Sequence, residues 1–526
     1  MLTRALRRPL LLAAAATATT LALTVVPITP ALAAGPTNGN RAATVAAATG
    51  SIAGRLATAG GAPVAGSWVT VNDEQGNYYN GGPTDADGQY RVDDLPAGSR
   101  YVVSFNGAHG VTQWAHHSLT VYGAQRFAVT EGQTTTVDET LAPVGAVRVV
   151  AHDAASGATL QRFCLWTAET SDYNRCTEDG AIVIDDVYAG AWHLMLSTDD
   201  GVHLDRGDVP VTVVSGQTAQ VDVALTAGAT ITTTLTDRAT GAPAQGCVQP
   251  VDVNQPLPDT GFRQWCTEGG GNTLQIGPIA PGTYQLIADP DLDTLGLQWV
   301  GAAGGTGSRE AAQLVTVASG GVAAGPAVQF DPAGIIRGKY TDVTTGAPVG
   351  GACVSVITPP RNPVGGDGCG RVTQPDGTYT LTGVGPYTWA VGFAKFQYQW
   401  RWTGNAVNRH EANTVTVVAG RKVAANLKAR SGGGTIVGTI RDSAGAPAGA
   451  YIRVVDALTG EPVAFAANVN QDATYTIGNV PPQQVKLYYV TPGGSAGWLG
   501  GTDLATARTY QIRNNRTTTI AVTVPV

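Results

Sequence analysis

Six cysteines are the residues of this chain best suited to covalent chemistry, and they occur in three close pairs. The pairs are Cys164 with Cys176, Cys247 with Cys266, and Cys353 with Cys369. Because an even number of closely paired cysteines in an exported protein typically forms disulfides, we expect three local disulfide bonds. Zinc binding is the alternative. It is disfavoured because no Cys-x-x-Cys motif occurs and no histidines cluster near a pair.

Two short motifs match functional patterns in their letters. Gly493-Gly-Ser495-Ala-Gly497 fits the Gly-x-Ser-x-Gly nucleophile elbow, which needs a strand before the serine and a helix after it. Pro492 precedes the motif and no histidine follows Gly434, so we interpret it as a loop. Leu257-Pro-Asp-Thr-Gly261 matches a sorting signal, but it lies far from the C-terminus and is also interpreted as a loop.

Two groups of residues could ligate metal. Asp289, Asp291 and Asp293 alternate as in a calcium loop, but Thr294 and Val300 stand where that loop needs Gly and Glu. We interpret this stretch as a solvated turn and leave calcium binding open. His116 and His117, with His109 nearby, are poor joint ligands because neighbours on a strand point to opposite faces. We therefore assign no metal site, no cofactor and no catalytic residue.

Five tryptophans are the candidates for binding carbohydrate, because an aromatic ring can stack its face on a sugar ring. They are Trp114, Trp299, Trp400, Trp402 and Trp498. The competing interpretation is packing in a core or between repeats. Trp400 and Trp402 lie two residues apart and would share one strand face, which makes them the preferred patch.

The elements that carry these residues are predicted to be strands. Apolar residues alternate in short runs, as in Val315-Thr-Val317, and the 526 residues include 68 Gly and 30 Pro to punctuate them. Charged residues make up only 13%, and a net charge of -7 gives no basic patch for nucleic acid. The composition predicts an all-β protein with many turns.

A repeat organises the strands into five units, which we predict to be immunoglobulin-like or prealbumin-like β-sandwiches. Each begins near a glycine, and a Gly-Ala-Pro turn recurs in four of them, for example Gly346-Ala-Pro348. Cys247 follows its turn one residue earlier than Cys353, so we expect an irregular start to its strand. The predicted units are 50–143, 144–226, 227–332, 333–431 and 432–526, called units 1 to 5 below.

The pattern Gly-x-Ile-x-Gly, Gly-Ala-Pro-Val, Asp-Gly-x-Tyr and a later Val resembles the carboxypeptidase regulatory-like domain, with prealbumin-like and collagen-adhesin B-type relatives. It recurs from Gly50 to the C-terminus and is weakest in unit 2. The resemblance implies a non-catalytic module in a secreted array. Its wider fold is similar to starch-binding domains and is associated with α-amylases. An amylase barrel takes about 250 residues, which the repeats leave no room for.

The N-terminus predicts export. Residues 1–33 combine Arg4, Arg7 and Arg8 with an apolar run and a small-residue cleavage site ending at Ala33. Residues 34–49 are interpreted as a flexible leader, and no membrane span is predicted in the mature chain. The sequence thus predicts a secreted, non-catalytic spacer or binding protein, with a polysaccharide-binding accessory or a hydrolase as the alternatives. We expect a monomer whose partner is a polysaccharide or a cell-surface protein.

Overall fold

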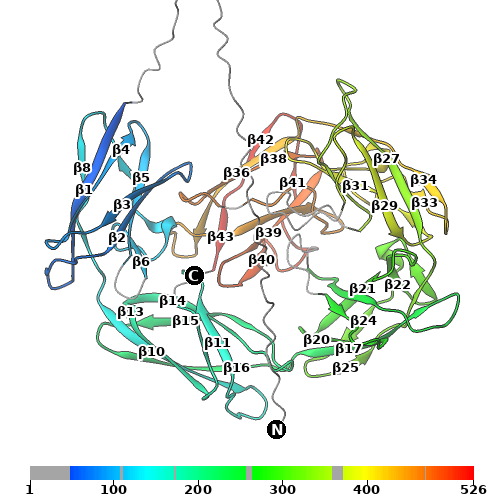
Figure 1. The fold of residues 1–526 in the computed structure, drawn as a ribbon, viewed down its shortest axis with the longest axis horizontal. Coiled ribbons are helices and arrows are strands. Elements are labelled where there is room, and N and C mark those ends of the chain that lie inside the picture. The colour runs from blue at the N-terminus through cyan, green and yellow to red at the C-terminus, as the bar shows by residue number, and fades with distance from the viewer. Residues whose placement is uncertain are drawn as a thin grey trace, which may run out of the picture. The chain divides into compact units, whose positions relative to one another are not determined.

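The computed structural model describes residues 48–106, 111–170, 173–255, 264–357, 371–467 and 469–525. Within these ranges the chain consists of strands and turns, with three short 3-10 helices at Val121–Gly123, Arg309–Ala311 and Thr403–Asn405 (Figure 1). The predicted all-β class is confirmed. Among the described residues, no helix has the length and apolar character to cross a membrane. The predicted export signal and nearly all of the leader lie outside the described residues.

The strands form five consecutive groups. Unit 1 contains β1 Thr49–Ala57, β2 Trp68–Asp73, β3 Tyr78–Pro83, β4 Gln89–Pro96, β5 Arg100–Asn106, β6 Thr112–Trp114, β7 Phe127–Ala128, β8 Thr134–Thr136 and β9 Glu139–Thr140. Unit 2 contains β10 Val144–Asp153, β11 Phe163–Thr167, β12 Arg175–Thr177, β13 Ala181–Tyr188, β14 Gly190–Ser197, β15 Arg206–Val213 and β16 Thr218–Leu225. Unit 3 contains β17 Ala229–Asp237, β18 Gly246–Asp252, β19 Trp265–Cys266, β20 Thr273–Ile279, β21 Gly282–Pro290, β22 Gln298–Gly301, β23 Gly304–Thr306, β24 Val315–Val317, β25 Val322–Ala324 and β26 Val328–Phe330.

The last two groups have the same plan. Unit 4 contains β27 Gly334–Asp342, β28 Cys353–Ser355, β29 Thr378–Val384, β30 Thr388–Trp389, β31 Gly392–Ala394, β32 Arg401–Trp402, β33 Val415–Thr416, β34 Lys422–Ala424 and β35 Leu427–Ala429. Unit 5 contains β36 Gly434–Asp442, β37 Tyr451–Asp456, β38 Thr474–Val480, β39 Gln484–Val490, β40 Ala496–Trp498, β41 Tyr510–Gln511, β42 Thr517–Thr519 and β43 Val522–Val524.

Each unit has two layers of sheet. In unit 1 the first sheet has the order β4-β1-β8 and the second the order β3-β2-β5-β6. The first strand of every unit pairs antiparallel on one side and parallel to the last strands on the other. We call the sheet containing β2, or its counterpart in another unit, the second sheet. Tandem β-sandwich architecture is thereby confirmed.

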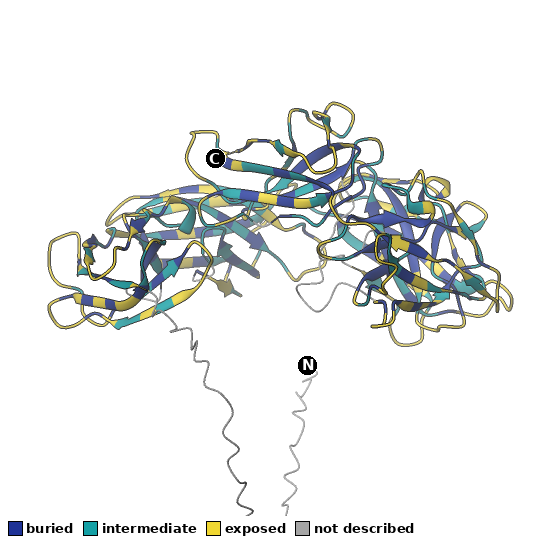
Figure 2. Ribbon diagram, turned by 90° about the horizontal axis from the view of Figure 1, so that it is seen from above, coloured by how far each residue is buried: buried dark blue, intermediate teal, exposed yellow. Residues whose placement is uncertain are grey.

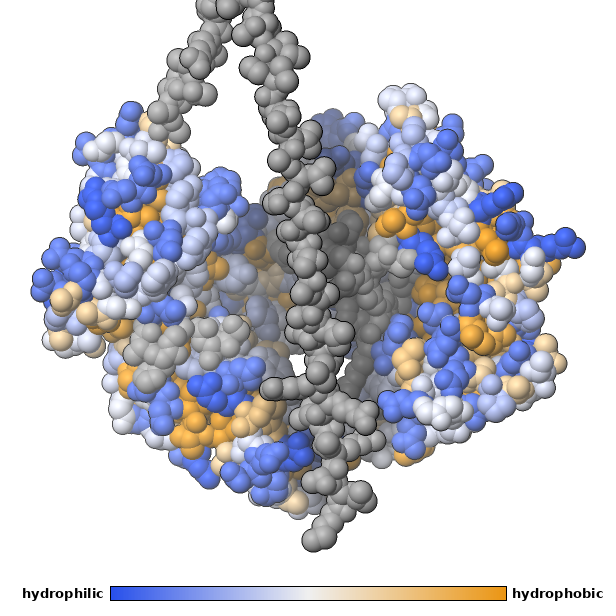
Figure 3. Space-filling model, in the orientation of Figure 1, coloured by the Kyte–Doolittle hydropathy of each residue, from blue (hydrophilic) through white to orange (hydrophobic). Residues whose placement is uncertain are grey.

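Burial alternates along the strands, as a sheet with one face on a core requires. In β29, Tyr379, Leu381 and Val384 are buried while Thr378 and Thr380 are exposed. Figure 2 shows this alternation of buried and exposed residues along many strands. On the face drawn in Figure 3, hydrophobic residues form scattered patches among hydrophilic ones.

A tyrosine from the Asp-Gly-x-Tyr type of turn ties the first sheet together in three units. Its hydroxyl donates to a carbonyl where the last strands break: Tyr90 to Val137 at 2.6 Å, Tyr379 to Ala425 at 2.5 Å and Tyr475 to Ile520 at 2.8 Å. The residue paired with each tyrosine is Gly54, Gly338 or Gly438. A Cβ on Gly338 would lie 1.9 Å from the Ala425 oxygen, so glycine is required for this close approach.

Units 2 and 3 lack this tyrosine and differ in how the carbonyls of their last strands are paired. In unit 3, Leu274 replaces the tyrosine, and the Thr233 hydroxyl donates to the Pro326 carbonyl at 2.7 Å. In unit 2, Val149 stands at the glycine position, and β10 and β16 pair without a break from Ala146 to Asp153. The glycine and tyrosine can therefore be replaced in two ways. In unit 3 another hydroxyl donates to the buried carbonyl, and in unit 2 the last strand has no break that would leave such a carbonyl unpaired.

A second aromatic contact recurs at the start of the central strand of the second sheet. Tyr101 donates to the Pro96 carbonyl at 2.7 Å and Tyr284 to Ala280 at 2.6 Å. The indole N–H of Trp192 donates to Tyr188 at 2.8 Å, and that of Trp389 to Gly385 at 2.9 Å. These aromatics bury a large apolar ring while their polar atom closes the preceding turn.

Candidate functional site

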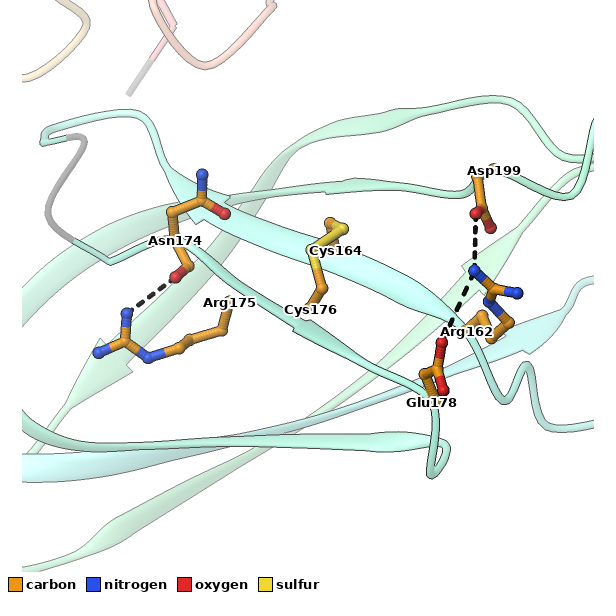
Figure 4. The surroundings of a disulfide bond; sticks show 7 residues. All are labelled: Arg162, Cys164, Asn174, Arg175, Cys176, Glu178 and Asp199. Atoms are coloured by element: carbon orange, nitrogen blue, oxygen red, sulfur yellow. Dashed lines mark hydrogen bonds and ion pairs between the residues drawn. A yellow bond between two sulfur atoms is a disulfide. The ribbon is translucent and has the colours of Figure 1, made fainter. Parts of the chain in front are cut away.

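Disulfide bonds join neighbouring strands of the second sheet. Cys164 and Cys176 are directly paired across β11 and β12, and Cys247 and Cys266 across β18 and β19, with Cα–Cα distances of 4.0 and 3.9 Å. Figure 4 shows the first bond between its two strands, near the ion pairs of Arg162 with Glu178 and Asp199. These two predicted disulfides are confirmed.

The third predicted pair is described only in part. Cys353 is disulfide-bonded, and none of the described cysteines is free. Cys369 lies outside the described residues, so its pairing stays a prediction. By the entropy of closing a short loop, each such bond stabilises its unit by about 3 kcal/mol.

The first cysteine of each pair occupies one fixed place in the repeat. Cys164, Cys247 and Cys353 pair with Ser197, Asp289 and Ala394, each five residues after the aromatic that begins the central strand. In unit 1 this place belongs to Trp68, which pairs with Asn106, and in unit 5 to Tyr451, which pairs with Val490. The three middle units thus have a cystine where the two outer units have an aromatic side chain.

The predicted irregular start of the Cys247 strand is not found there; the difference in spacing lies in the loop before Cys353. Because Cys247 and Cys353 have the same pairing register, the extra residue before Cys353 is absorbed in the preceding loop. Gly351 takes a φ of 68° there, and Gly66 takes a φ of 77° at the matching place in unit 1. A positive φ is accessible to glycine, so these two units bend the chain once more before the strand begins.

Four of the five candidate tryptophans are buried. The exposed fraction is 2% for Trp299, 3% for Trp400 and Trp402, and 6% for Trp498. Trp402 lies over Gly392, where an added Cβ would approach its ring to 3.0 Å, and Trp498 packs edge-on against Tyr488. Arg401 between the preferred pair is also buried, so the expected alternation does not hold there. Stacking these four rings on a sugar would require uncovering them.

Trp114 differs from the other four because it keeps intermediate exposure. It ends β6 and pairs with Ser104 of β5, on the side of the second sheet that faces away from the core. Trp68 begins β2 on the same side and is 44% exposed. The sequence analysis missed Trp68. Its signal is that it falls out of phase with the buried Val69 and Val71.

The other motifs lie in ordinary surroundings. Ser495 sits in the turn between β39 and β40, where its hydroxyl donates to the carboxylate of Asp208, and it is followed at once by strand, so no nucleophile elbow forms. The sorting-like stretch 257–261 and His109 lie outside the described residues. Asp289 is the penultimate residue of β21, and burial, with the charges of Asp291 and Asp293, raises the pKa of its carboxyl. Across the described ranges, no group of three or more His, Cys, Asp or Glu is arranged to hold a metal ion.

His116 and His117 converge rather than diverge. The Nδ1 atom of each lies 3.1 Å from the buried carboxylate of Glu139, to which Gln113 also donates at 3.0 Å. The expectation that they face opposite ways was wrong because β6 ends at Trp114 and His117 takes a φ of 57°. Off the strand, the alternation rule no longer applies.

A second histidine is held between two carboxylates in unit 2. His203 is 8% exposed, with Nδ1 at 2.6 Å from Asp200 and Nε2 at 2.9 Å from Asp153. Burial lowers the pKa of His203, but the hydrogen bonds to Asp200 and Asp153 outweigh it and raise the pKa above its ordinary value. Despite burial, hydrogen bonds from the His203 backbone and side chain lower the pKa of Asp200 to about 2. The geometry makes this cluster a structural clamp, in which one imidazole holds two carboxylates.

Residues 51–142, which are nearly all of unit 1, match the model of the carboxypeptidase regulatory-like domain. Unit 1 is thus similar to the carboxypeptidase regulatory-like domain. The resemblance drawn from the sequence is confirmed for this regulatory-like domain, and the other four units have the same order of strands around their first strand. A search among curated proteins finds no match to the chain.

Similar solved structures include bacterial pilins. The TIE protein of Bacillus anthracis is 12% identical, with 73% of this chain and 74% of that chain covered and a TM-score of 0.16. A streptococcal ancillary pilin is 13% identical, with 54% and 99% covered and a TM-score of 0.20. BcpA, the major pilin subunit of Bacillus cereus, is 9% identical, with 73% and 99% covered and a TM-score of 0.14. At these TM-scores we draw no conclusion from them about function.

Proposed function

We propose that this chain is a secreted array of β-sandwich units that acts outside the cell as a spacer and binding protein, without catalysis of its own. The observation that carries the proposal is the pair of cystines bridging adjacent strands in units 2 and 3, with Cys353 bonded as well. Such bonds form and persist in oxidising compartments. They strengthen sandwiches that carry few charges and many short strands.

The polar chemistry of the site supports a structural role. The side-chain clusters around His203 and Glu139 are held together by hydrogen bonds and ion pairs among their own members. Ser495 is in a hairpin turn rather than at an elbow. A hydrolase built on the Gly493–Gly497 motif is disfavoured, because strand rather than helix follows Ser495.

Export and cystine formation can be tested together. The full chain is expressed in a bacterial host beside a variant lacking residues 1–33, and the cysteines are alkylated and counted by mass spectrometry. We expect the full chain outside the cytoplasm with all six cysteines protected, and the truncated variant inside with free thiols. A full chain that stays in the cytoplasm with reduced cysteines would overturn the proposal.

A further inference from the structure

The second sheet of unit 1 has an outer face opposite its core, and on that face only the central strand β5 is buried, at Val102 (2% exposed) and Ser104 (7% exposed). The inner side chains of β2 and β5, such as Val69, Val103 and Phe105, are 0% exposed. The residues between them point to the opposite face, because side chains alternate along a strand. We call that opposite surface of β3, β2, β5 and β6 the outer face of unit 1 (Figure 1).

The pairing register sets out the residues of the outer face in three rows. The first row is Pro83, Trp68, Asn106 and Thr112, the second is Asn80, Thr70, Ser104 and Trp114, and the third is Tyr78, Asn72 and Val102. Three aromatics therefore lie on one side of the sheet, with the buried Ser104 and Val102 of β5 between Trp114 and the other two rings. Trp68 is 44% exposed and Tyr78 is 58% exposed, which is unusual for large rings.

None of these eleven positions carries a charged side chain, although the chain as a whole has a net charge of -7. Arg100, at the far end of β5, lies beyond the third row. Among the described residues, the side chains of Asn72 and Asn106 have no hydrogen-bond partner, so each has a free amide donor and acceptor. An uncharged face with open amides complements a neutral ligand rich in hydroxyl groups.

The spacing of the rings fits an extended ligand. Rows one and three are four residues apart, about 13 Å along β2, and Trp114 lies two strands from Trp68, about 10 Å across. The Tyr78 hydroxyl reaches 3.5 Å from the Thr70 hydroxyl, which brings its ring over the middle row. Rings at this spacing offer several stacking positions, each with hydroxyl or amide groups beside it.

We infer that the outer face of unit 1 binds a neutral polysaccharide by stacking sugar rings on Trp68, Tyr78 and Trp114 while Asn72 and Asn106 bond sugar hydroxyls. The apolar C–H face of a sugar ring covers an aromatic face, and the hydroxyls at its rim reach the amides. This inference rests on the proposed function as an extracellular binding protein and names its ligand class.

The other units supply an internal contrast at the same register position. In unit 5, Tyr451 replaces Trp68, but Arg453 takes the Thr70 position and its guanidinium lies 5.6 Å from the Tyr451 ring. In units 2 and 3 the position holds a cystine. Unit 4 has the bonded Cys353 there, so among the described residues at this register position unit 1 presents an uncharged aromatic side chain, and the site should be lost by changes in unit 1.

The test is affinity gel electrophoresis of the purified exported chain in gels containing soluble starch, dextran, galactomannan or hydroxyethyl cellulose, with alginate as an anionic comparison. We expect retardation by at least one neutral polysaccharide and none by alginate. Trp68→Ala with Tyr78→Ala should weaken that binding about tenfold or more, because two stacking contacts are removed. Thr70→Arg, which copies unit 5, should weaken it as well.

The matched control is Tyr451→Ala, at the same register position in unit 5, which should leave retardation unchanged. Thermal unfolding of each variant checks that it folds. The inference is overturned if no neutral polysaccharide retards the chain, if alginate alone does, or if folded unit 1 variants bind as tightly as the parent chain. Because export and cystine formation are read by alkylation, failure here leaves the proposed function separately testable.

Discussion

Tyr379 shows how much of the repeat depends on single polar atoms. Its ring packs edge-on to Phe393 in the core, while its hydroxyl reaches the carbonyl of Ala425 on the far side of Gly338. A buried carbonyl without a partner costs free energy comparable to a lost hydrogen bond. The glycine and the tyrosine are therefore one device, present in units 1, 4 and 5 and replaced together in units 2 and 3.

Tyr379→Phe is predicted to lower the free energy of unfolding of unit 4 by about 1–3 kcal/mol, since the Ala425 carbonyl loses this donor. Calorimetric unfolding of the full chain measures it. Tyr78→Phe is the matched control, because Tyr78 is exposed and its hydroxyl contact is 3.5 Å long. Equal effects of the two changes would contradict this account of the hydrogen bond.

At the scale of elements, side-chain clusters tie loops to strands. His203 lies in the segment between β14 and β15, and its two partners are Asp200 of the same segment and Asp153 at the end of β10. The clamp therefore links the second sheet of unit 2 to the first strand of its other sheet. A hydrogen bond from Ser156, together with His203, lowers the pKa of Asp153.

Protonation of His203 is expected to make the stability of unit 2 depend on pH. Because the pKa of His203 is raised in the folded state, its stabilisation is complete below the ordinary histidine value of about 6.5 and is lost as pH rises through the raised pKa. The lowered pKa values of Asp153 and Asp200 give stabilisation that is lost only as pH falls well below about 3.9. His203→Gln should therefore destabilise the chain more at pH 5 than at pH 9. A calorimetric difference that is the same at both pH values would argue against the clamp.

Much of the element layout could be predicted from sequence, because alternation and turn residues are local signals. The strand after Asp376-Gly-Thr-Tyr379 and the cystine between Cys164 and Cys176 follow from such signals. Whether a tryptophan is buried or exposed does not follow from such local signals. Trp402 is buried because Gly392, on a neighbouring strand, leaves room for its ring, and only the pairing register reveals that contact. Trp68 was overlooked because the prediction relied on recurrence. Trp114 stands at a tryptophan position that recurs in the repeat, and Trp68 does not.

Across the described residues, the units of this repeated plan differ at one register position of the second sheet. In the three middle units this position holds a disulfide-bonded cysteine. In units 1 and 5 it holds an aromatic residue. Where the cystine is absent, the position is free to meet a ligand, and unit 1 surrounds it with uncharged polar groups. The chain thus combines units that resist unfolding with one unit whose outer face is suited to binding.

The most direct test of the account is to measure binding and catalysis on the same sample. The exported chain is incubated with soluble starch, dextran, galactomannan and hydroxyethyl cellulose, and bound protein and newly formed reducing ends are both quantified over time. The account predicts binding to a neutral polysaccharide, reduced by Trp68→Ala with Tyr78→Ala, and no reducing ends beyond those of a heat-unfolded control. Reducing ends that increase in proportion to the concentration of folded protein would contradict it.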